Sequence, residues 1–349
     1  MFVEPLVHGD TVRRLWRAAQ LSRLPHALLF EGPEGVGKSL AARWFVAGLL
    51  CAEGPGEPCG VCGPCKRLAS GNHPDFFAID PVAENVEQIP VARISARSKG
   101  DVPPEGSLEE FLGLCPMEGS WRCVLVRMSH RMNTSAQNAL LKTLEEPRPG
   151  TVLLLETNLA ARLLPTIRSR CIRIRMGGLP VEEAHAILAE RGLEAGEAEL
   201  LARWSGGSPG RALVFQRRGV IPLVRTLEAA LSGKLAPLRA AAHIWDLEGE
   251  FPGKTPAAKA RGRARFALDL MLDLLADAEK LDAGIDPLRL PFGEVARPLL
   301  PRGIEARRRT LEALLACRSD IDRNLAPEGV LERSLLAWAG AERRARVSH

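Results

Sequence analysis

The chain has 349 residues, enough for two or three domains with packed cores. Hydrophobic residues make up 46% and charged residues 26%, which is ordinary for a soluble globular protein. No apolar run reaches the roughly 18–20 residues that a membrane span needs, and the first residues lack a secretory signal. We therefore expect a cytoplasmic protein without membrane partners. The net charge of +5 permits contact with nucleic acid but does not require it.

The first predicted elements alternate between helix and strand. Residues 11–22 have the spacing of an amphipathic helix, and the apolar run at 26–32, HALLFEG, is typical of a buried strand. A glycine-rich loop follows, and residues 39–51 continue with helical spacing. Strand, glycine-rich loop and helix in this order begin a parallel α/β domain.

The alternation continues to about residue 177. A helix at 135–147 is stopped by Pro147, and further strands are predicted at 121–128, 151–158 and 170–176. This order predicts a parallel sheet covered by helices on both faces. Residues 95–107 form a polar break before a short helix. After Gly178 the predicted elements are helices only, short ones first and then helices from 218 to the end.

The loop GPEGVGKS matches the phosphate-binding pattern GxxxxGK[ST]. Its glycines let consecutive backbone N–H groups turn toward a phosphate chain, and they are Gly32, Gly35 and Gly37. Lys38 can reach the β- and γ-phosphates of a nucleotide, and the Ser39 hydroxyl can ligate Mg²⁺. A glycine turn with an accidental lysine is the alternative, and the position between strand and helix argues against it.

Nucleotide hydrolysis also needs an acidic residue at the end of a neighbouring strand. The expected strand, 124–126, is followed by Arg127 and Met128, so neither position carries a carboxylate and Arg127 would repel a metal ion. His130 could act as a base, but a lone histidine at a strand end is more often a surface residue. The sequence therefore predicts a loop that can bind phosphate in a domain that lacks the acidic residues needed for nucleotide hydrolysis.

Four of the eight cysteines are clustered: Cys51, Cys59, Cys62 and Cys65. In an intracellular chain, clustered cysteines argue for metal rather than disulfides. Four thiolates bind Zn²⁺ tetrahedrally and leave no position for water, which predicts a closed structural zinc site. An iron–sulfur cluster or free thiols are the alternatives, and nothing else in the sequence suggests redox chemistry.

Together these motifs resemble the bacterial DNA polymerase III clamp-loader subunits of the AAA+ class. A phosphate loop followed by a four-cysteine zinc module is similar to that family. Three further segments resemble its signature motifs: NALLKTLEEP (138–147), LLPTIRSRC (163–171) and GGSPGRAL (206–213). The resemblance implies an AAA+ domain at 1–176 with a zinc module at 51–65, a helical lid at 177–217 and an all-helical collar at 218–349.

Two types of subunit share these motifs, the ATP-hydrolysing gamma/tau type and the delta-prime type with a degraded ATP site. Three departures favour the delta-prime type. The Walker B carboxylates fall on Arg127 and Met128, the lid arginine aligns with Gly210 beside Arg211, and no long tau-like extension follows. The phosphate loop is intact, which leaves ATP and Mg²⁺ binding open.

The resemblance also implies roles for two residues. Thr157 falls at the sensor 1 position of the family, although a threonine ending a strand is an equally good interpretation. Arg170 aligns with the arginine finger that reaches a neighbouring subunit's ATP site, and the alternative is an arginine paired with a surface carboxylate.

The expected function is to brace a heteropentamer with gamma/tau and delta subunits, and to help place the sliding clamp on primer-template DNA. One rival is an active ATPase, either gamma/tau-like or an unrelated P-loop enzyme. The other is a zinc-dependent DNA-binding module, and the absence of basic and aromatic residues between Cys51 and Cys65 argues against it.

Overall fold

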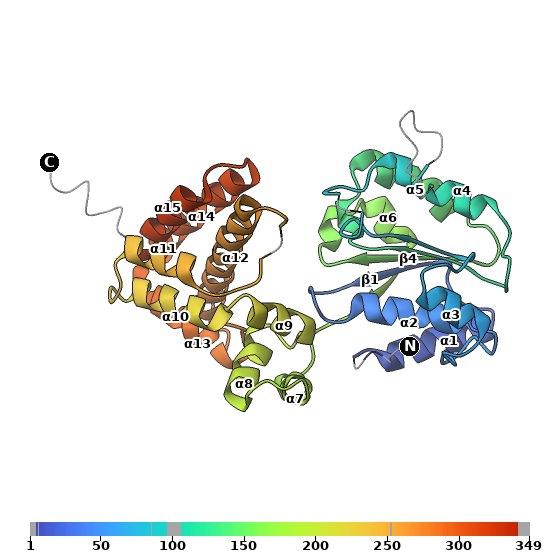
Figure 1. Ribbon diagram of the computed structural model, residues 1–349, viewed down its shortest axis with the longest axis horizontal. Helices are drawn as coiled ribbons and strands as arrows, with labels where there is room; N and C mark the ends of the chain where they lie inside the picture. Colours follow the sequence, from blue (N-terminus) through green and yellow to red (C-terminus); the bar gives the residue numbers. More distant parts are fainter. Residues whose placement is uncertain (1–4, 6, 85, 96–105, 252, 341–349) are drawn as a thin grey trace. The chain divides into compact units, whose positions relative to one another are not determined.

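The computed structural model describes residues 5, 7–84, 86–95, 106–251 and 253–340. The chain divides into two compact units, Met1–Gly178 and Leu179–His349 (Figure 1). The first unit contains a sheet covered by helices, and the described part of the second is helical. Most of the polar break predicted at 95–107 lies outside the described residues.

A five-stranded parallel sheet forms the centre of the first unit. The strand order is β2-β3-β4-β1-β5, and every pairing is parallel. The strands are β1 Ala27–Glu31, β2 Phe76–Ile79, β3 Arg122–Val126, β4 Thr151–Thr157 and β5 Ile172–Arg175. β4 lies between β1 and β3, so the carboxyl ends of these three strands meet at one edge of the sheet.

Helices cover both faces of this sheet, as the sequence predicted (Figure 1). Alternate residues of β1 enter opposite cores: Leu28 and Phe30 pack with α1 and α2, whereas Ala27 and Leu29 pack with α5 and α6. The helices of this unit are α1 Gly9–Gln20, α2 Lys38–Leu50, α3 Gly63–Ala69, α4 Leu108–Gly113, α5 Thr134–Glu145 and α6 Pro165–Arg170, with 3₁₀ turns η1 Val91–Arg93, η2 Ser129–Arg131 and η3 Ala160–Arg162.

Local sequence explains where these helices begin and end. The Asn133 side chain accepts a hydrogen bond from the Ala136 N–H and so caps α5, which ends two residues before Pro147. Pro165 opens α6, where a missing N–H costs nothing. α6 is short and ends at Arg170, and one residue, Cys171, separates it from the last strand.

The second unit is built from helices around one hydrophobic core, which includes Leu201, Phe292 and Trp338. Its helices are α7 Val181–Glu190, α8 Ala195–Trp204, α9 Pro209–Arg217, α10 Val220–Leu231, α11 Pro237–Asp246, α12 Pro256–Asp282, α13 Gly293–Ala296, α14 Ile304–Asp322 and α15 Pro327–Ala339, with 3₁₀ turns η4 Pro287–Arg289 and η5 Arg297–Arg302. Because one core joins α7–α9 to the later helices, the division into lid and collar at residue 217 stays a prediction.

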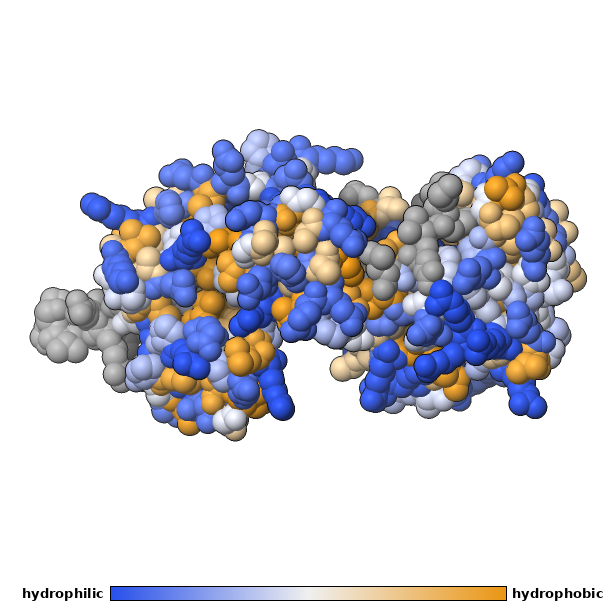
Figure 2. Space-filling view, turned by 90° about the horizontal axis from the view of Figure 1, so that it is seen from below, coloured by the Kyte–Doolittle hydropathy of each residue, from blue (hydrophilic) through white to orange (hydrophobic). Residues whose placement is uncertain are grey.

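Hydrophobic and hydrophilic residues are interspersed over the face of each unit that Figure 2 shows. Large hydrophobic side chains that remain exposed in the second unit include Leu238, Leu288, Ile304 and Leu315. None of the helices in the described part of the chain combines the length and apolarity needed to cross a bilayer.

Candidate functional site

The phosphate loop joins the end of β1 to the start of α2. A Cβ at Gly32 would lie 1.9 Å from the carbonyl oxygen of Met176, the residue that follows β5. Gly37, directly before α2, has a φ of 94°, and Gly35 has a φ of 78°. A close backbone approach at one end and left-handed backbone in the middle explain why these positions are glycine.

Lys38 and Ser39 open α2 beside this loop. The Lys38 ammonium donates hydrogen bonds to the carbonyl oxygens of Gly32 at 2.8 Å and Pro33 at 2.6 Å. Burial lowers the pKa of Lys38, while the negative charges of Glu156 and Glu34 oppose that shift. The Ser39 hydroxyl donates to the Glu156 carboxylate at 2.6 Å. An ammonium and a hydroxyl therefore stand next to each other where phosphate and Mg²⁺ would be held.

Glu156 is a candidate site residue that the sequence analysis missed. It is the penultimate residue of β4 and is only 7% exposed. Its one signal in the sequence was a single charged residue inside the apolar run TVLLLETN. A buried charge in a strand needs partners, and here the Ser39 hydroxyl and the Arg127 guanidinium, both from other elements, contact it.

Arg127 directly follows β3, at the position where a nucleotide-hydrolysing domain carries an acidic residue. Its guanidinium forms an ion pair with Asp80, which directly follows β2. Its Nε also lies 3.5 Å from Glu156 Oε2. The donor set of Lys38, Ser39 and Glu156 fits a nucleotide with Mg²⁺, but the end of β3 offers a cation in place of a general base.

Thr157 ends β4, and its backbone carbonyl accepts a hydrogen bond from the Gly32 N–H at 3.2 Å. Its hydroxyl lies 3.1 Å from His130 Nδ1 and accepts a hydrogen bond from the Leu159 N–H. His130 is half-buried rather than on the open surface that the sequence suggested. Burial, together with the nearby cations, lowers the pKa of His130 to about 4, so the ring is neutral at pH 7. A role for Thr157 as a nucleotide sensor stays a prediction.

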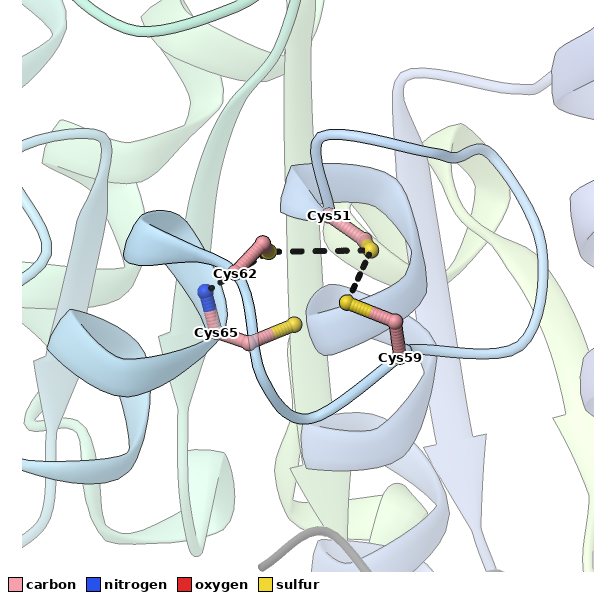
Figure 3. A group of neighbouring side chains, drawn as sticks. All are labelled: Cys51, Cys59, Cys62 and Cys65. Carbon is pink, nitrogen blue, oxygen red and sulfur yellow. Dashed lines mark hydrogen bonds between the residues drawn. The ribbon is translucent and has the colours of Figure 1, made fainter.

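The four clustered cysteines converge on one point (Figure 3). Cys51 follows α2, Cys59 lies in the connecting loop, and Cys62 and Cys65 belong to the start of α3. All four sulfur atoms lie within 4.8 Å of one another, and Cys51 Sγ lies 3.6 Å from Cys59 Sγ and 3.9 Å from Cys62 Sγ. All eight cysteines are free, so no disulfide competes for these thiols.

This geometry fits a tetrahedral metal ion. Zn–S bonds of about 2.3 Å place neighbouring sulfur atoms about 3.8 Å apart, close to the separations found here. Burial pushes the pKa of Cys62 upward, but hydrogen bonds from the backbone of Ala52 and Cys65 outweigh it and lower the pKa to about 6. Zinc binds the thiolate, so the lowered pKa of Cys62 favours binding. Burial raises the pKa of Cys51 and Cys65, so a bound metal ion would have to displace the protons of these two thiols. The cluster could therefore hold zinc, with Cys51, Cys59, Cys62 and Cys65 as ligands.

Arg170 lies away from the phosphate loop, at the end of α6. Its Nη2 forms an ion pair with Glu145 Oε1 on α5 at 2.7 Å, and its Nη1 donates to the Thr166 carbonyl. The side chains of Arg170 and Glu145 are 36% and 50% exposed. A pair this exposed contributes about 0–1 kcal/mol, so the guanidinium can leave Glu145 at little cost.

The lid positions named in the sequence analysis lie in the second unit. Gly210 is in the first turn of α9, and Arg211 beside it donates to Asp273 at 2.5 Å and stacks on Phe215. In the first unit, the sheet order and the phosphate loop after β1 define an AAA+ P-loop domain, and the clustered cysteines form an insertion in it.

Comparison with known proteins relates the chain to subunits of DNA polymerase III. Residues 7–179 match the family model described as DNA polymerase III, delta subunit. The chain is 39% identical over 216 residues to DNA polymerase III subunit delta' of Pseudomonas aeruginosa, covering 59% of this chain and 62% of the relative. It is 26% identical to subunit delta' of Bacillus subtilis over 93% of this chain and 94% of the relative. The chain is thus similar to the delta' subunits of DNA polymerase III, over its first unit in the family model and over nearly its whole length in the Bacillus protein.

A second group of relatives covers less of the chain. Subunit gamma/tau of Mycobacterium tuberculosis is 35% identical over 215 residues, which is 60% of this chain and 35% of that protein. The matched part is thus common to both subunit types. The alignments span less than two thirds of the Pseudomonas and mycobacterial relatives.

Proposed function

We propose that this chain braces the DNA polymerase III clamp loader while the complex places the sliding clamp on primed DNA. It would join gamma/tau and delta subunits in the cytoplasm, hold a structural zinc ion, and lend Arg170 to a neighbour's ATP site. The observation that carries the proposal is the alignment with subunit delta' of Bacillus subtilis, which covers nearly the whole of both chains.

The collar would supply the contacts with the other subunits. Two hydrophobic residues on α14, Leu311 and Leu315, are 39% and 49% exposed and lie one turn apart on the helix. Residues four apart share a helix face, so both can enter one interface. Exposed leucines at such spacing support a role of the second unit in assembly.

We expect this chain to copurify with gamma/tau and delta subunits when the three are produced together, because its family is found in that complex. Size-exclusion chromatography with mass determination would give one defined complex. A double Leu311→Asp, Leu315→Asp variant should weaken assembly, whereas Leu21→Asp, on an exposed position of the first unit, should not. A wild-type chain that elutes alone in the presence of both partners would contradict the proposal.

We also propose that the chain does not hydrolyse ATP. The support is the Arg127 side chain, which follows β3 and engages Asp80 and Glu156 instead of offering a base to an attacking water.

The isolated chain should therefore release phosphate from ATP at the background rate. A phosphate-release assay checks this, with an isolated gamma/tau subunit as the positive control. A turnover near the enzyme median of about 10 s⁻¹ would support the second candidate, an active gamma/tau-like ATPase. The intact phosphate loop is the observation that favours this second candidate function.

A further inference from the structure

Glu156 and Ser39 bring a carboxylate and a hydroxyl together beside the phosphate loop. Ser39 stands in the first turn of α2, and Glu156 comes from β4, the strand that pairs with β1 on one side and β3 on the other. The Glu156 side chain is only 10% exposed, and its Oε2 lies 2.6 Å from Ser39 Oγ. The carbonyl of Glu156 accepts a hydrogen bond from the buried Ser129 hydroxyl at 2.9 Å, which fixes the backbone here.

The charges around this pair leave one negative charge in excess. Arg127 carries one positive charge, and its two partners, Asp80 and Glu156, carry one negative charge each. Lys38 adds one positive charge near Glu156, and Glu34, which also acts on Lys38, adds one negative charge, so one negative charge remains in excess. Arg127 is therefore engaged from two sides, and its charge is balanced before any ligand arrives. The repulsion of a metal ion that the sequence alone suggested is offset by these carboxylates.

We propose that Glu156 supplies, from β4, the carboxylate that holds Mg²⁺ beside Ser39 and so makes nucleotide binding by this chain depend on Mg²⁺. Mg²⁺ takes oxygen ligands at about 2.1 Å in an octahedron, which places neighbouring ligands about 3 Å apart. The Ser39 and Glu156 oxygens, 2.6 Å apart, are close to that separation. Without the metal, the buried carboxylate repels a triphosphate; with it, carboxylate and phosphate share one dication.

This inference concerns the chain's own phosphate loop and does not rest on assembly or on Arg170. The opposite role for Glu156 is the alternative: the carboxylate would hold the Ser39 hydroxyl in a hydrogen bond and so keep nucleotide out. The two roles predict opposite effects on nucleotide binding. Removing the Glu156 charge weakens Mg²⁺-dependent binding in the first case and strengthens nucleotide binding in the second.

The test is the affinity of the full chain for a fluorescent ATP analogue, measured with Mg²⁺ and again with a chelator. Wild type should bind at least about tenfold more tightly with Mg²⁺. Glu156→Gln, which keeps the shape and removes the charge, should lose that gain, since removing a partner at a metal centre costs about 10–100-fold in metal affinity or activity. Glu156→Asp should recover part of it. Mn²⁺ in place of Mg²⁺ gives a second readout, because the paramagnetic resonance spectrum of bound Mn²⁺ reports its ligands directly.

Glu34→Gln is the matched control. Glu34 is an exposed carboxylate of the same loop whose charge also acts on Lys38, so the variant removes an equal charge away from Ser39. It should keep the Mg²⁺ dependence. Three results would overturn the inference: no nucleotide binding by wild type at millimolar concentration, equal losses in Glu34→Gln and Glu156→Gln, or Glu156→Gln binding as tightly as wild type or more tightly. Unfolding curves of each variant exclude a folding defect.

Discussion

Replacing Arg170 by alanine should abolish one ATP site of the assembled clamp loader while leaving assembly intact. The transferred phosphoryl group spreads negative charge over its equatorial oxygens, and a guanidinium from a neighbouring subunit stabilises that charge. Arginines supplied in this way contribute about 10³–10⁵ in rate in GTPases. The affected site should therefore lose nearly all turnover, and steady-state ATPase with clamp and DNA should fall by that site's share. Clamp loading should fall with it.

The ion pair between Arg170 and Glu145 provides a control that separates a structural role of Arg170 from a role in the neighbouring subunit. If Arg170 acts only by holding α6 to α5, then Glu145→Ala should impair the complex as much as Arg170→Ala, because either change breaks the pair. If Arg170 acts on the neighbour, Glu145→Ala should leave ATPase and clamp loading close to wild type. Lysine at 170 should rescue poorly, since it lacks the planar fork of donors. An Arg170→Ala complex with unchanged ATPase and loading would refute the proposed role.

The second large effect concerns the cysteine cluster. Purified chain should contain about one zinc ion, and Cys51→Ser should reduce that content to near zero. Structural zinc binds small domains with apparent free energies of about 10–16 kcal/mol, and a closed four-ligand site loses most of this with one ligand. Elemental analysis measures the metal. Hydrogen exchange should show lost protection around residues 51–69, while the second unit, which has its own core, keeps its protection.

Cys115→Ser is the matched control for this change, because Cys115 is exposed and lies outside the cluster. It should keep both zinc and stability. Iron with sulfide in the purified protein would mean that the cluster serves redox chemistry instead. Full zinc content in Cys51→Ser would show that the metal sits elsewhere.

The parts of the fold that were predicted from sequence have local signals. The strands β1, β3 and β4 each contain a continuous run of four apolar residues, and the phosphate loop has a recognisable spacing of glycines. β2 was missed because it has four residues, Phe76–Ile79, of which three are only partly buried at the edge of the sheet. A strand this short lacks enough periods to separate it from a loop.

The site was predicted only where one segment contains it. Four cysteines within 15 positions and an eight-residue loop are visible in the sequence. Glu156 was not, because its partner Ser39 lies 117 positions earlier and is brought to it only by the pairing of β1 with β4. The engagement of Arg127 by Asp80 likewise depends on β2, the strand that sequence analysis missed. The contacts of Glu156 and Arg127 therefore depend on strand pairing between distant segments, which the sequence pattern does not predict.

The close approach of the Gly32 backbone to Met176 has a consequence for the phosphate loop and for the proposed role of Arg170. Met176 ends a stretch that begins at Arg170 and runs through β5, whose residues pair with β1 from Leu28 to Glu31. The helix that ends at Arg170 leads into β5, and the phosphate loop follows β1, so both are connected to adjacent strands of the same sheet. These strands approach closely at Gly32, which has no room for a side chain. Any residue larger than glycine at position 32 would push these strands apart. Such a change would distort the chain's own phosphate loop and shift the helix that ends at Arg170, so under the proposed role of Arg170 one substitution would impair two ATP sites.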